Sequence, residues 1–392
     1  MIKLYYNKYP YKNIVNREQD GVDVWNDLPN NPQDSSFYKV LNSLGIEYQW
    51  SDNPDNSIVI ADVGSLHHRT PEFDKVIENV ANTYKKAIIL STQEPWQKDT
   101  IDKILGLYPN IMLSDCHYPL ANANIYHDRY IPFQYYFTSI SNIEQNIVIK
   151  YPDIDYKEHV YLFNCLMFNW RPDKHILRTA LRYSNIEDNL ITFRHENCED
   201  KIDQIKQFVQ HSDNERFKSE ALTWFDDSNL PFDDVVLQPN KRVFDQTFRA
   251  WPKRIFDQSV FSLICESFSG TEIQAGPYVT EKSLYPFING HPLIVFGEKD
   301  YYKYLTSYGF AIHDELFNYD FDSEPDPIAR SIFITEQIKG MNIDIQHKIN
   351  PYDSVTRQKA RHNQYLLNNR ASTLWRKLKQ EMTTNIQRYL DL

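Results

Sequence analysis

The sequence has few cysteines, and none is spaced for a metal site or a disulfide framework. The four are Cys116, Cys165, Cys198 and Cys265, and no Cys-X-X-Cys pair occurs among them. Zinc sites and small disulfide-stabilised folds use closely spaced cysteines, so this pattern excludes both classes. Reduced thiols are the simplest interpretation, and they predict a cytoplasmic protein.

Long hydrophobic runs are also absent. No segment of the sequence approaches the roughly 18 consecutive apolar residues that identify a membrane-spanning helix. The apolar start at residues 1–6 is too short, and too quickly followed by polar residues, for a signal peptide. We therefore expect neither a membrane span nor a secretory leader.

Positive charge is in deficit over the chain as a whole. Lys and Arg number 42 against 53 Asp and Glu, which gives a formal net charge of −11. Surplus negative charge opposes non-specific binding to nucleic acid, so nucleic acid is not an expected partner. Basic residues do gather toward the C-terminal end: Arg357, Lys359, Arg361, Arg370, Arg376, Lys377, Lys379 and Arg388.

The length of the chain predicts two domains, because 392 residues exceed what one hydrophobic core usually serves. We place an N-terminal Rossmann-like domain at residues 1–152 and a C-terminal Rossmann-like domain at residues 153–350. A basic amphipathic helix follows within residues 351–392. We predict it to run unbroken over residues 354–390, with Tyr365, Leu366, Leu374, Leu378, Met382 and Ile386 on its apolar side.

Both predicted domains alternate apolar runs with helical patterns. In the first, strands are predicted at 57–61, 87–90 and 111–113, with helices at 71–85 and around 101–105. In the second, strands are predicted at 160–163, 191–193, 260–265 and 292–296, with helices at 173–183, 201–210 and 278–289. We expect Pro286 to kink the last helix or end it early. This alternation favours parallel sheets covered by helices, which is the α/β class.

The most informative segment is Tyr278-Val279-Thr280-Glu281-Lys282, between the apolar runs 261–265 and 292–296. It brings an aromatic ring, a carboxylate and an ammonium together at the start of a predicted helix. The carboxylate can accept hydrogen bonds from ribose hydroxyls, and the lysine can neutralise phosphate charge where backbone N–H groups also favour anions. The alternative is an ordinary helix start, capped by Thr280 and followed by a solvated Glu–Lys pair.

These segments together resemble the donor-binding signature of the α-1,3/4-fucosyltransferases. In that family a strand ending in Glu-Asn leads to Tyr-Val-Thr-Glu-Lys, then a helix, then a strand that opens with proline. Residues 88–94 and 128–136 also resemble the N-terminal half of the family, so the similarity extends over about residues 85 to 300. Two departures concern the donor: Ser267 replaces the asparagine, and residues 269–277 form a longer connection.

The resemblance implies roles for particular residues. It implies that Glu281 and Tyr278 hold the nucleoside of the donor and that Lys282 lies near its diphosphate. It also assigns Glu266, at the end of a predicted strand, to the donor site. An arginine near a helix start binds the diphosphate in this family. By the match we favour Arg178 for that role over Arg171, and the alternative is a surface helix arginine.

Glu94 is the candidate catalytic base. It follows the predicted strand 87–90, and the family's proposed base lies at the matching position. Inverting glycosyl transfer needs a base to accept the proton of the attacking hydroxyl. The alternative is a loop glutamate that caps the next helix.

No metal site is predicted. The Asp-X-Asp sequences at 153–155 and 320–322 match a metal–nucleotide motif of other glycosyltransferases, but such matches arise by chance in an Asp-rich chain. Cationic side chains would do the work of the metal. We expect no cofactor beyond a nucleoside diphosphate sugar donor.

The resemblance thus implies a glycosyltransferase with the GT-B fold, in which two Rossmann-like domains face a cleft. The two predicted α/β domains and the terminal helix fit this fold. The expected reaction is inverting transfer of a sugar, with GDP-fucose as the leading donor, to a hydroxyl of a glycan acceptor. Two alternatives remain: a viral-type glycosyltransferase acting on DNA bases, and a non-catalytic module that binds nucleotide sugars or glycans. For the terminal helix we prefer packing across the domains over peripheral contact with a membrane.

Overall fold

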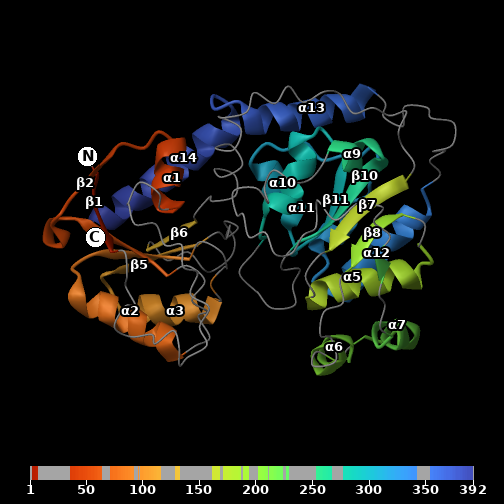
Figure 1. Cartoon of the computed structure of the whole chain (residues 1–392), viewed down its shortest axis with the longest axis horizontal. Coiled ribbons are helices and arrows are strands. Elements are labelled where there is room, and N and C mark those ends of the chain that lie inside the picture. The colour runs from red at the N-terminus through yellow and green to blue at the C-terminus, as the bar shows by residue number, and fades with distance from the viewer. Residues whose placement is uncertain are drawn as a thin grey trace. The chain divides into compact units, whose positions relative to one another are not determined.

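A computed structural model describes most of the chain. The described residues are 2–7, 36–63, 71–91, 96, 98–115, 129–132, 161–167, 171–186, 189–193, 202–210, 212–223, 227–228, 253–266, 277–341 and 354–391. They form a mixed α/β structure with two largely parallel sheets and surrounding helices (Figure 1). The chain divides into two compact units, which are described separately below. The first contains Met1–Asn142 and Arg370–Leu392, and the second contains Ile143–Glu272 and Pro277–Asn369.

The first unit is built on a six-stranded sheet with the order β2-β1-β3-β4-β5-β6. Every neighbouring pair in it is parallel. Its strands are β1 (Ile2–Asn7), β2 (Tyr48–Trp50), β3 (Ile58–Asp62), β4 (Ala87–Leu90), β5 (Ile111–Asp115) and β6 (Tyr130–Pro132). Its helices are α1 (Ser36–Ser43), α2 (Pro71–Thr83), α3 (Lys98–Leu107) and α14 (Thr373–Asp391). The strands and helices predicted for this half of the chain are confirmed, and β4 is buried along its whole length, as its unbroken apolar sequence indicates.

Side chains close the helix ends near the amino ends of β4 and β5. The amide of Asn110 donates to the carbonyl oxygens of Ala81 and Tyr84, each at 2.7 Å, just where α2 ends. The guanidinium of Arg129 donates to the Tyr108 carbonyl at 2.6 Å, just beyond α3. These donors satisfy carbonyl groups that a helix leaves without intrahelical partners.

The last helix, α14, packs on the same edge of the first unit. The Tyr389 hydroxyl lies 2.6 Å from the carbonyl oxygen of Asn110 and 3.2 Å from that of Ala87. The Lys86 ammonium donates to the carbonyl oxygens of Tyr389 and Leu390 at 3.2 and 2.9 Å. The apolar side of this helix is buried: Leu374, Trp375, Leu378, Met382, Ile386 and Tyr389. Among the described helices, none has the length and hydropathy to cross a lipid bilayer.

The prediction of one unbroken helix over residues 354–390 is wrong. The structure has α13 (Ser354–Asn368), which belongs to the second unit, and then α14. The interruption falls at a polar stretch whose asparagines and serine favour helix ends over helix interiors. The backbone N–H of Arg376 bonds back to the carbonyl of Ser372 at 3.3 Å, which starts the new helix. Tyr365, which we predicted on the apolar side, is 58% exposed.

The second unit is built on a sheet with the order β11-β10-β7-β8-β9, in which only the β8–β9 pair is antiparallel. Its strands are β7 (Tyr161–Met167), β8 (Leu190–Phe193), β9 (Asp227–Ser228), β10 (Ser259–Cys265) and β11 (Leu293–Phe296). Its helices are α5 (Pro172–Tyr183), α6 (Ile202–Val209), α7 (Glu215–Ala221), α9 (Lys253–Asp257), α10 (Glu281–Ile288), α11 (Tyr301–Ser307), α12 (Pro327–Lys339) and α13. The four strands predicted in this half are confirmed.

A buried polar network joins β7 and β10 to the start of the edge strand β11. The amide of Asn164 in β7 donates to the hydroxyl oxygens of Ser259 and Ser262 in β10, at 2.7 and 3.0 Å. His291, just before β11, lies 2.8 Å from the Ser259 carbonyl and 2.9 Å from the Ser262 hydroxyl. Because a carbonyl only accepts, Nε2 of His291 carries the hydrogen and Nδ1 accepts from Ser262. All four side chains are buried, so these bonds favour one strand register.

Helix α10 is shorter than predicted at its start. It begins at Glu281, whereas residues 278–280 lie outside the helix, and it continues two residues beyond Pro286. Proline is tolerated there because it removes a single hydrogen bond from a helix that ends two residues later. Gly290 follows with a φ of +64°, and a Cβ atom at this glycine would lie 2.7 Å from the Gln364 amide nitrogen of α13. The close approach lets that amide donate to the Ile288 carbonyl at 3.0 Å.

Candidate functional site

Two helices begin at the carboxyl ends of neighbouring parallel strands in the second unit. Strands β7 and β10 pair directly, α5 follows β7, and α10 is held to the end of β10 by hydrogen bonds. This edge of a parallel sheet is where α/β proteins bind their ligands. Helix N-termini also present unpaired N–H groups and a partial positive charge, so the edge favours an anion.

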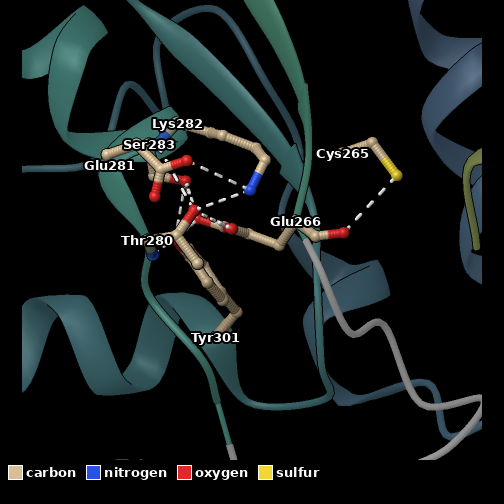
Figure 2. Close-up of polar contacts among 7 residues, drawn as sticks. All are labelled: Cys265, Glu266, Thr280, Glu281, Lys282, Ser283 and Tyr301. Carbon is tan, nitrogen blue, oxygen red and sulfur yellow. Dashed lines mark hydrogen bonds and ion pairs between the residues drawn. The ribbon is translucent and has the colours of Figure 1, made fainter. Parts of the chain in front are cut away.

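Glu266 joins β10 to the start of α10 (Figure 2). Its carboxylate is fully buried. Oε1 accepts from the Thr280 backbone N–H at 3.1 Å and from the Ser283 hydroxyl at 2.6 Å, and Oε2 accepts from the Thr280 hydroxyl at 2.6 Å. The Tyr301 hydroxyl lies 3.1 Å from Oε1 and 2.7 Å from the Ser283 oxygen. All of these contacts are internal, so Glu266 fixes the segment that was predicted to bind the donor.

Thr280 caps α10. Its backbone is extended, with φ of −110° and ψ of 179°, and its hydroxyl oxygen accepts from the Lys282 backbone N–H at 3.3 Å. The local structure is therefore the capped helix start that the sequence pattern suggested. The cap also keeps the first turn of α10 in a fixed position relative to Glu266 and hence to β10.

Glu281 and Lys282 form a pair that is only partly exposed. The Lys282 ammonium lies 3.4 Å from the Glu281 carboxylate, and their side chains are 21% and 26% exposed. The same ammonium lies 3.3 Å from the Thr280 hydroxyl (Figure 2). A freely solvated Glu–Lys pair would be far more exposed, so the surrounding protein constrains both side chains.

Tyr278 is placed differently from the residues that follow it. Its ring is 2% exposed, and the adjacent Val279 is completely buried. In this conformation the ring supports the segment from inside and offers almost no surface to a nucleoside. Its predicted contact with the donor would need a change in that packing.

The helix α5 brings two predicted arginines and one unpredicted lysine to the same edge. Arg171 occupies the N-cap position of α5 with an extended backbone, and Pro172 takes the first helical position. Arg178 lies in the same helix and is 3% exposed. Lys174, in the first turn of α5, is 4% exposed. Sequence reasoning missed Lys174, although a lysine in a first helical turn is itself a signal, since the helix dipole disfavours a cation there.

Electrostatic influences link Lys174 to Lys282 and Arg171, and they link both Lys174 and Arg178 to Cys165. Burial, together with the positive charges of Lys282 and Arg171, lowers the pKa of Lys174 to about 7. Burial raises the pKa of Cys165 in β7 to about 12, against the opposing influence of Arg178 and Lys174. The four residues Arg171, Lys174, Arg178 and Lys282 are called the basic cluster below. They come from two helices and border the carboxyl ends of β7 and β10.

Acidic groups also border this edge. Burial lowers the pKa of Arg330 in α12, whereas the negative charges of Glu298 and Asp173, among others, raise it. Arg330 donates to the Pro325 carbonyl at 3.2 Å and lies over the Phe296 ring, 6.0 Å from its centroid. We therefore assign Arg330 to the packing of α12 and not to the basic cluster.

Some predicted residues fall elsewhere. Glu94 and residues 153–155 lie outside the described residues. Asp322 accepts hydrogen bonds from the backbone N–H groups of Tyr302 and Lys303 at 3.0 to 3.1 Å, so it caps α11. Over the part of the chain that the structure describes, no cluster of His, Cys, Asp and Glu is arranged to hold a metal ion.

The basic cluster can bind a phosphate or diphosphate. It combines two helix N-termini with cationic side chains, and the buried carboxylate of Glu266 fixes the start of one of these helices, α10. Comparison of the chain with protein-family models, with curated proteins and with solved structures finds no match in any of the three.

Proposed function

We propose that the protein is an inverting glycosyltransferase with the GT-B fold, which moves a sugar from a nucleoside diphosphate to a hydroxyl acceptor. The observation that supports this most is the basic cluster, in which cations of α5 and α10 meet at the carboxyl ends of β7 and β10. The arrangement suits a diphosphate, which carries two anionic groups within the reach of two helix starts. The two parallel sheets are compatible with paired Rossmann-like domains.

In the proposed reaction the acceptor oxygen attacks the anomeric carbon while the bond from that carbon to the diphosphate breaks. Negative charge grows on the leaving nucleoside diphosphate, and Lys282 with Arg178 and Arg171 would offset it. Glu281 would accept hydrogen bonds from the ribose hydroxyls. Glu94 would accept the proton that the acceptor hydroxyl loses.

Glu266 has a positioning role in this proposal. Its carboxylate is engaged by Thr280, Ser283 and Tyr301, so it would act on the donor through the segment it holds. GDP-fucose is the leading donor because of the resemblance of residues 278–282 and their flanking strands to the fucosyltransferase signature. The acceptor class we propose is a glycan hydroxyl.

Nucleotide binding is the first test. We would measure thermal unfolding of the full chain with GDP, UDP, ADP and CDP and with their sugars. A nucleotide at about a hundred times its dissociation constant should stabilise the protein by about 2.7 kcal/mol. Absence of a shift with every nucleotide would contradict the proposal.

Turnover is the second test. With the donor that binds best, Lys282→Ala should lower turnover at least about a hundredfold, because it removes a cation that stabilises the leaving group. Lys206→Ala is the matched control, since Lys206 lies in α6 of the same unit with a side chain 57% exposed. Near-normal turnover of Lys282→Ala would refute its role. Donor binding without transfer or hydrolysis, unchanged by Glu94→Gln, would instead indicate a non-catalytic binding module.

A further inference from the structure

Tyr301 reaches the candidate site from a third strand of the sheet. Strand β11 ends beside β10, since Cys265 pairs with Phe296 and the Glu266 backbone N–H bonds to the Phe296 carbonyl at 3.0 Å. Helix α11 follows β11, and Tyr301 is its first residue. The Tyr301 side chain is 1% exposed, and its hydroxyl lies 3.1 Å from the Glu266 carboxylate (Figure 2). The carboxyl end of β11 thus contributes to a segment that β10 and α10 otherwise build.

The Tyr301 hydroxyl donates to the network around Glu266. The Ser283 hydroxyl uses its hydrogen for the Glu266 carboxylate at 2.6 Å, so its oxygen, 2.7 Å from the Tyr301 hydroxyl, accepts from the tyrosine. Burial and the negative charge of Glu266 raise the pKa of Tyr301, so its hydroxyl keeps the hydrogen that it donates. The Glu266 carboxylate in turn accepts from the backbone N–H and the hydroxyl of Thr280. Tyr301 therefore supports, through Ser283 and Glu266, the residue that caps α10.

Gly297 lets the Tyr301 ring lie close to the end of β11. It directly follows that strand and is buried. A Cβ atom at this position would lie 2.8 Å from Cδ2 of Tyr301 and 3.3 Å from its Cγ and Cε2 atoms. Cβ atoms do not approach other atoms to less than 3.0 Å, so the ring would have to move. Because the ring is rigid, a shift at Cδ2 also displaces its hydroxyl from Ser283 and Glu266.

The start of α11 is held by contacts that do not involve the tyrosine ring. The Asp322 carboxylate accepts from the backbone N–H groups of Tyr302 and Lys303 at 3.0 to 3.1 Å. Asp300, just before Tyr301, has a left-handed backbone with φ of 62°, which is uncommon for residues other than glycine. Backbone held in such a conformation tends to occur at functional sites. The placement of Tyr301 is therefore set by its own helix as well as by β11.

We propose that Tyr301 is a positioning residue of the donor site, and that Gly297 is required there because it makes room for the tyrosine ring. The inference rests on the proposed function, in which the first turn of α10 holds the nucleoside diphosphate. Tyr301 does not contact the donor in this proposal. It keeps Ser283 and Glu266 in place, and these two hold the Thr280 cap from which α10 starts. Without the hydroxyl, that turn would be correctly placed in only a fraction of the molecules, and the affinity for the donor falls by that fraction.

The first comparison uses the two adjacent tyrosines of α11. Tyr301→Phe removes the hydroxyl and keeps the ring. Tyr302→Phe is the matched control, because Tyr302 is 3% exposed and its hydroxyl accepts from the Val295 backbone N–H at 2.6 Å, outside the Glu266 network. In urea unfolding the control should lose at least as much stability, since Val295 loses this acceptor. GDP binding, measured by titration calorimetry of the full chain, should weaken about three- to tenfold in Tyr301→Phe alone.

The second comparison uses glycines. Gly297→Ala should weaken GDP binding at least as much as Tyr301→Phe does, because the added Cβ displaces the ring and its hydroxyl. In the double variant Gly297→Ala/Tyr301→Phe the two losses should not add, since both act through the same hydroxyl. Gly340→Ala is the control, because a Cβ atom at that glycine of the same unit would meet nothing closer than 3.5 Å. It should bind GDP as the unmodified chain does.

The outcomes separate this inference from the proposed function. Weaker GDP binding in Tyr301→Phe, with unchanged binding in Tyr302→Phe and no further loss in the double variant, supports the inference. Unchanged binding in Tyr301→Phe, equal weakening in both tyrosine variants, or full additivity in the double variant overturns it and leaves the donor site intact. UDP replaces GDP in every arm if it binds the unmodified chain more tightly. Failure of both nucleotides to bind the unmodified chain overturns the donor site, and the inference with it.

Far-ultraviolet circular dichroism shows whether each variant folds. If Tyr301→Phe does not fold, Ser283→Ala takes its place, because it removes the oxygen that accepts from the Tyr301 hydroxyl. Ser283 is completely buried, so its loss would act on the donor only through the segment that it holds. The same weakening relative to Tyr302→Phe is expected. A folded Ser283→Ala variant that binds GDP as tightly as the unmodified chain would then overturn the inference.

Discussion

Replacement of Glu266 by glutamine tests whether a buried carboxylate holds the start of α10 in place. The carboxylate accepts from the Thr280 backbone N–H, the Thr280 hydroxyl and the Ser283 hydroxyl, and the Tyr301 hydroxyl lies 3.1 Å away. Glutamine has nearly the same shape, so the change alters charge and hydrogen bonding while the packing volume is kept. Its amide nitrogen donates and cannot accept.

The expected cost follows from these contacts. Bonds to a charged acceptor contribute about 1.5–3 kcal/mol each, and bonds to a neutral one about 0.5–1.5 kcal/mol. Glutamine loses one bond completely and weakens the others, which amounts to roughly 4–6 kcal/mol. Relief from burying a charge offsets part of this loss. We therefore expect Glu266→Gln to lower the free energy of unfolding by about 2–4 kcal/mol.

The assay is urea unfolding of the full chain, followed by far-ultraviolet circular dichroism. Glu215→Gln is the matched control, because Glu215 lies in α7 of the same unit with a side chain 82% exposed, and its effect should stay within about 0.5 kcal/mol. Affinity for GDP provides a second readout. It should weaken in Glu266→Gln because the Thr280 cap loses its anchor. If Glu266→Gln is as stable as the control and binds GDP equally well, the argument from Figure 2 is refuted.

Two further predictions concern the framework of the second unit. Gly290→Ala should destabilise the protein by about 1–3 kcal/mol in urea unfolding, because a residue with φ of +64° disfavours a Cβ and that atom would lie 2.7 Å from the Gln364 side chain. Asp322, which caps α11, has a pKa raised by burial from 3.8 to about 6, so the folded state binds its proton more tightly than the unfolded state does. Stability should therefore fall by about 2–3 kcal/mol as the pH rises from 4 to 7, and the loss should be absent in Asp322→Asn, as urea midpoints at the two pH values would show.

Much of the fold could be predicted because it depends on local pattern. The run 87–90 is apolar throughout, which is typical of a strand covered on both faces, and β4 is such a strand. The start of α10 was signalled by the threonine before Glu281-Lys282, a common cap residue. Both features need only a few consecutive residues to be recognised.

Other features depend on contacts between distant residues and could not be predicted in the same way. The sequence around Lys174 does not show that α10 places Lys282 beside it. Glu266 was assigned to the ligand, whereas its four oxygen contacts in the described residues are to Thr280, Ser283 and Tyr301. A glutamate at the end of a strand has the same local sequence pattern whether it contacts a ligand or anchors the next helix. Only the position of that helix distinguishes the two roles.

The interruption between α13 and α14 has a similar explanation. Hydrophobic residues keep their helical spacing across it, so periodicity predicted one helix. The two halves nevertheless pack on different units, since Gln364 bonds to the Ile288 carbonyl and Tyr389 to the Asn110 carbonyl.

The distribution of polar groups over the two edges of the sheets supports a binding role for one of them. In the first unit, Asn110, Arg129 and Lys86 occupy the amino-end edge, and their donors are directed to carbonyl groups at helix ends. These three side chains stabilise the fold through those hydrogen bonds. At the carboxyl-end edge of the second unit, Lys174 and Lys282 instead lie near helix N-termini, where each opposes the dipole. Cations placed against the dipole cost stability, and the Glu281 carboxylate, 3.4 Å from the Lys282 ammonium, offsets part of that cost. Under the proposed function, a bound diphosphate would offset more of it.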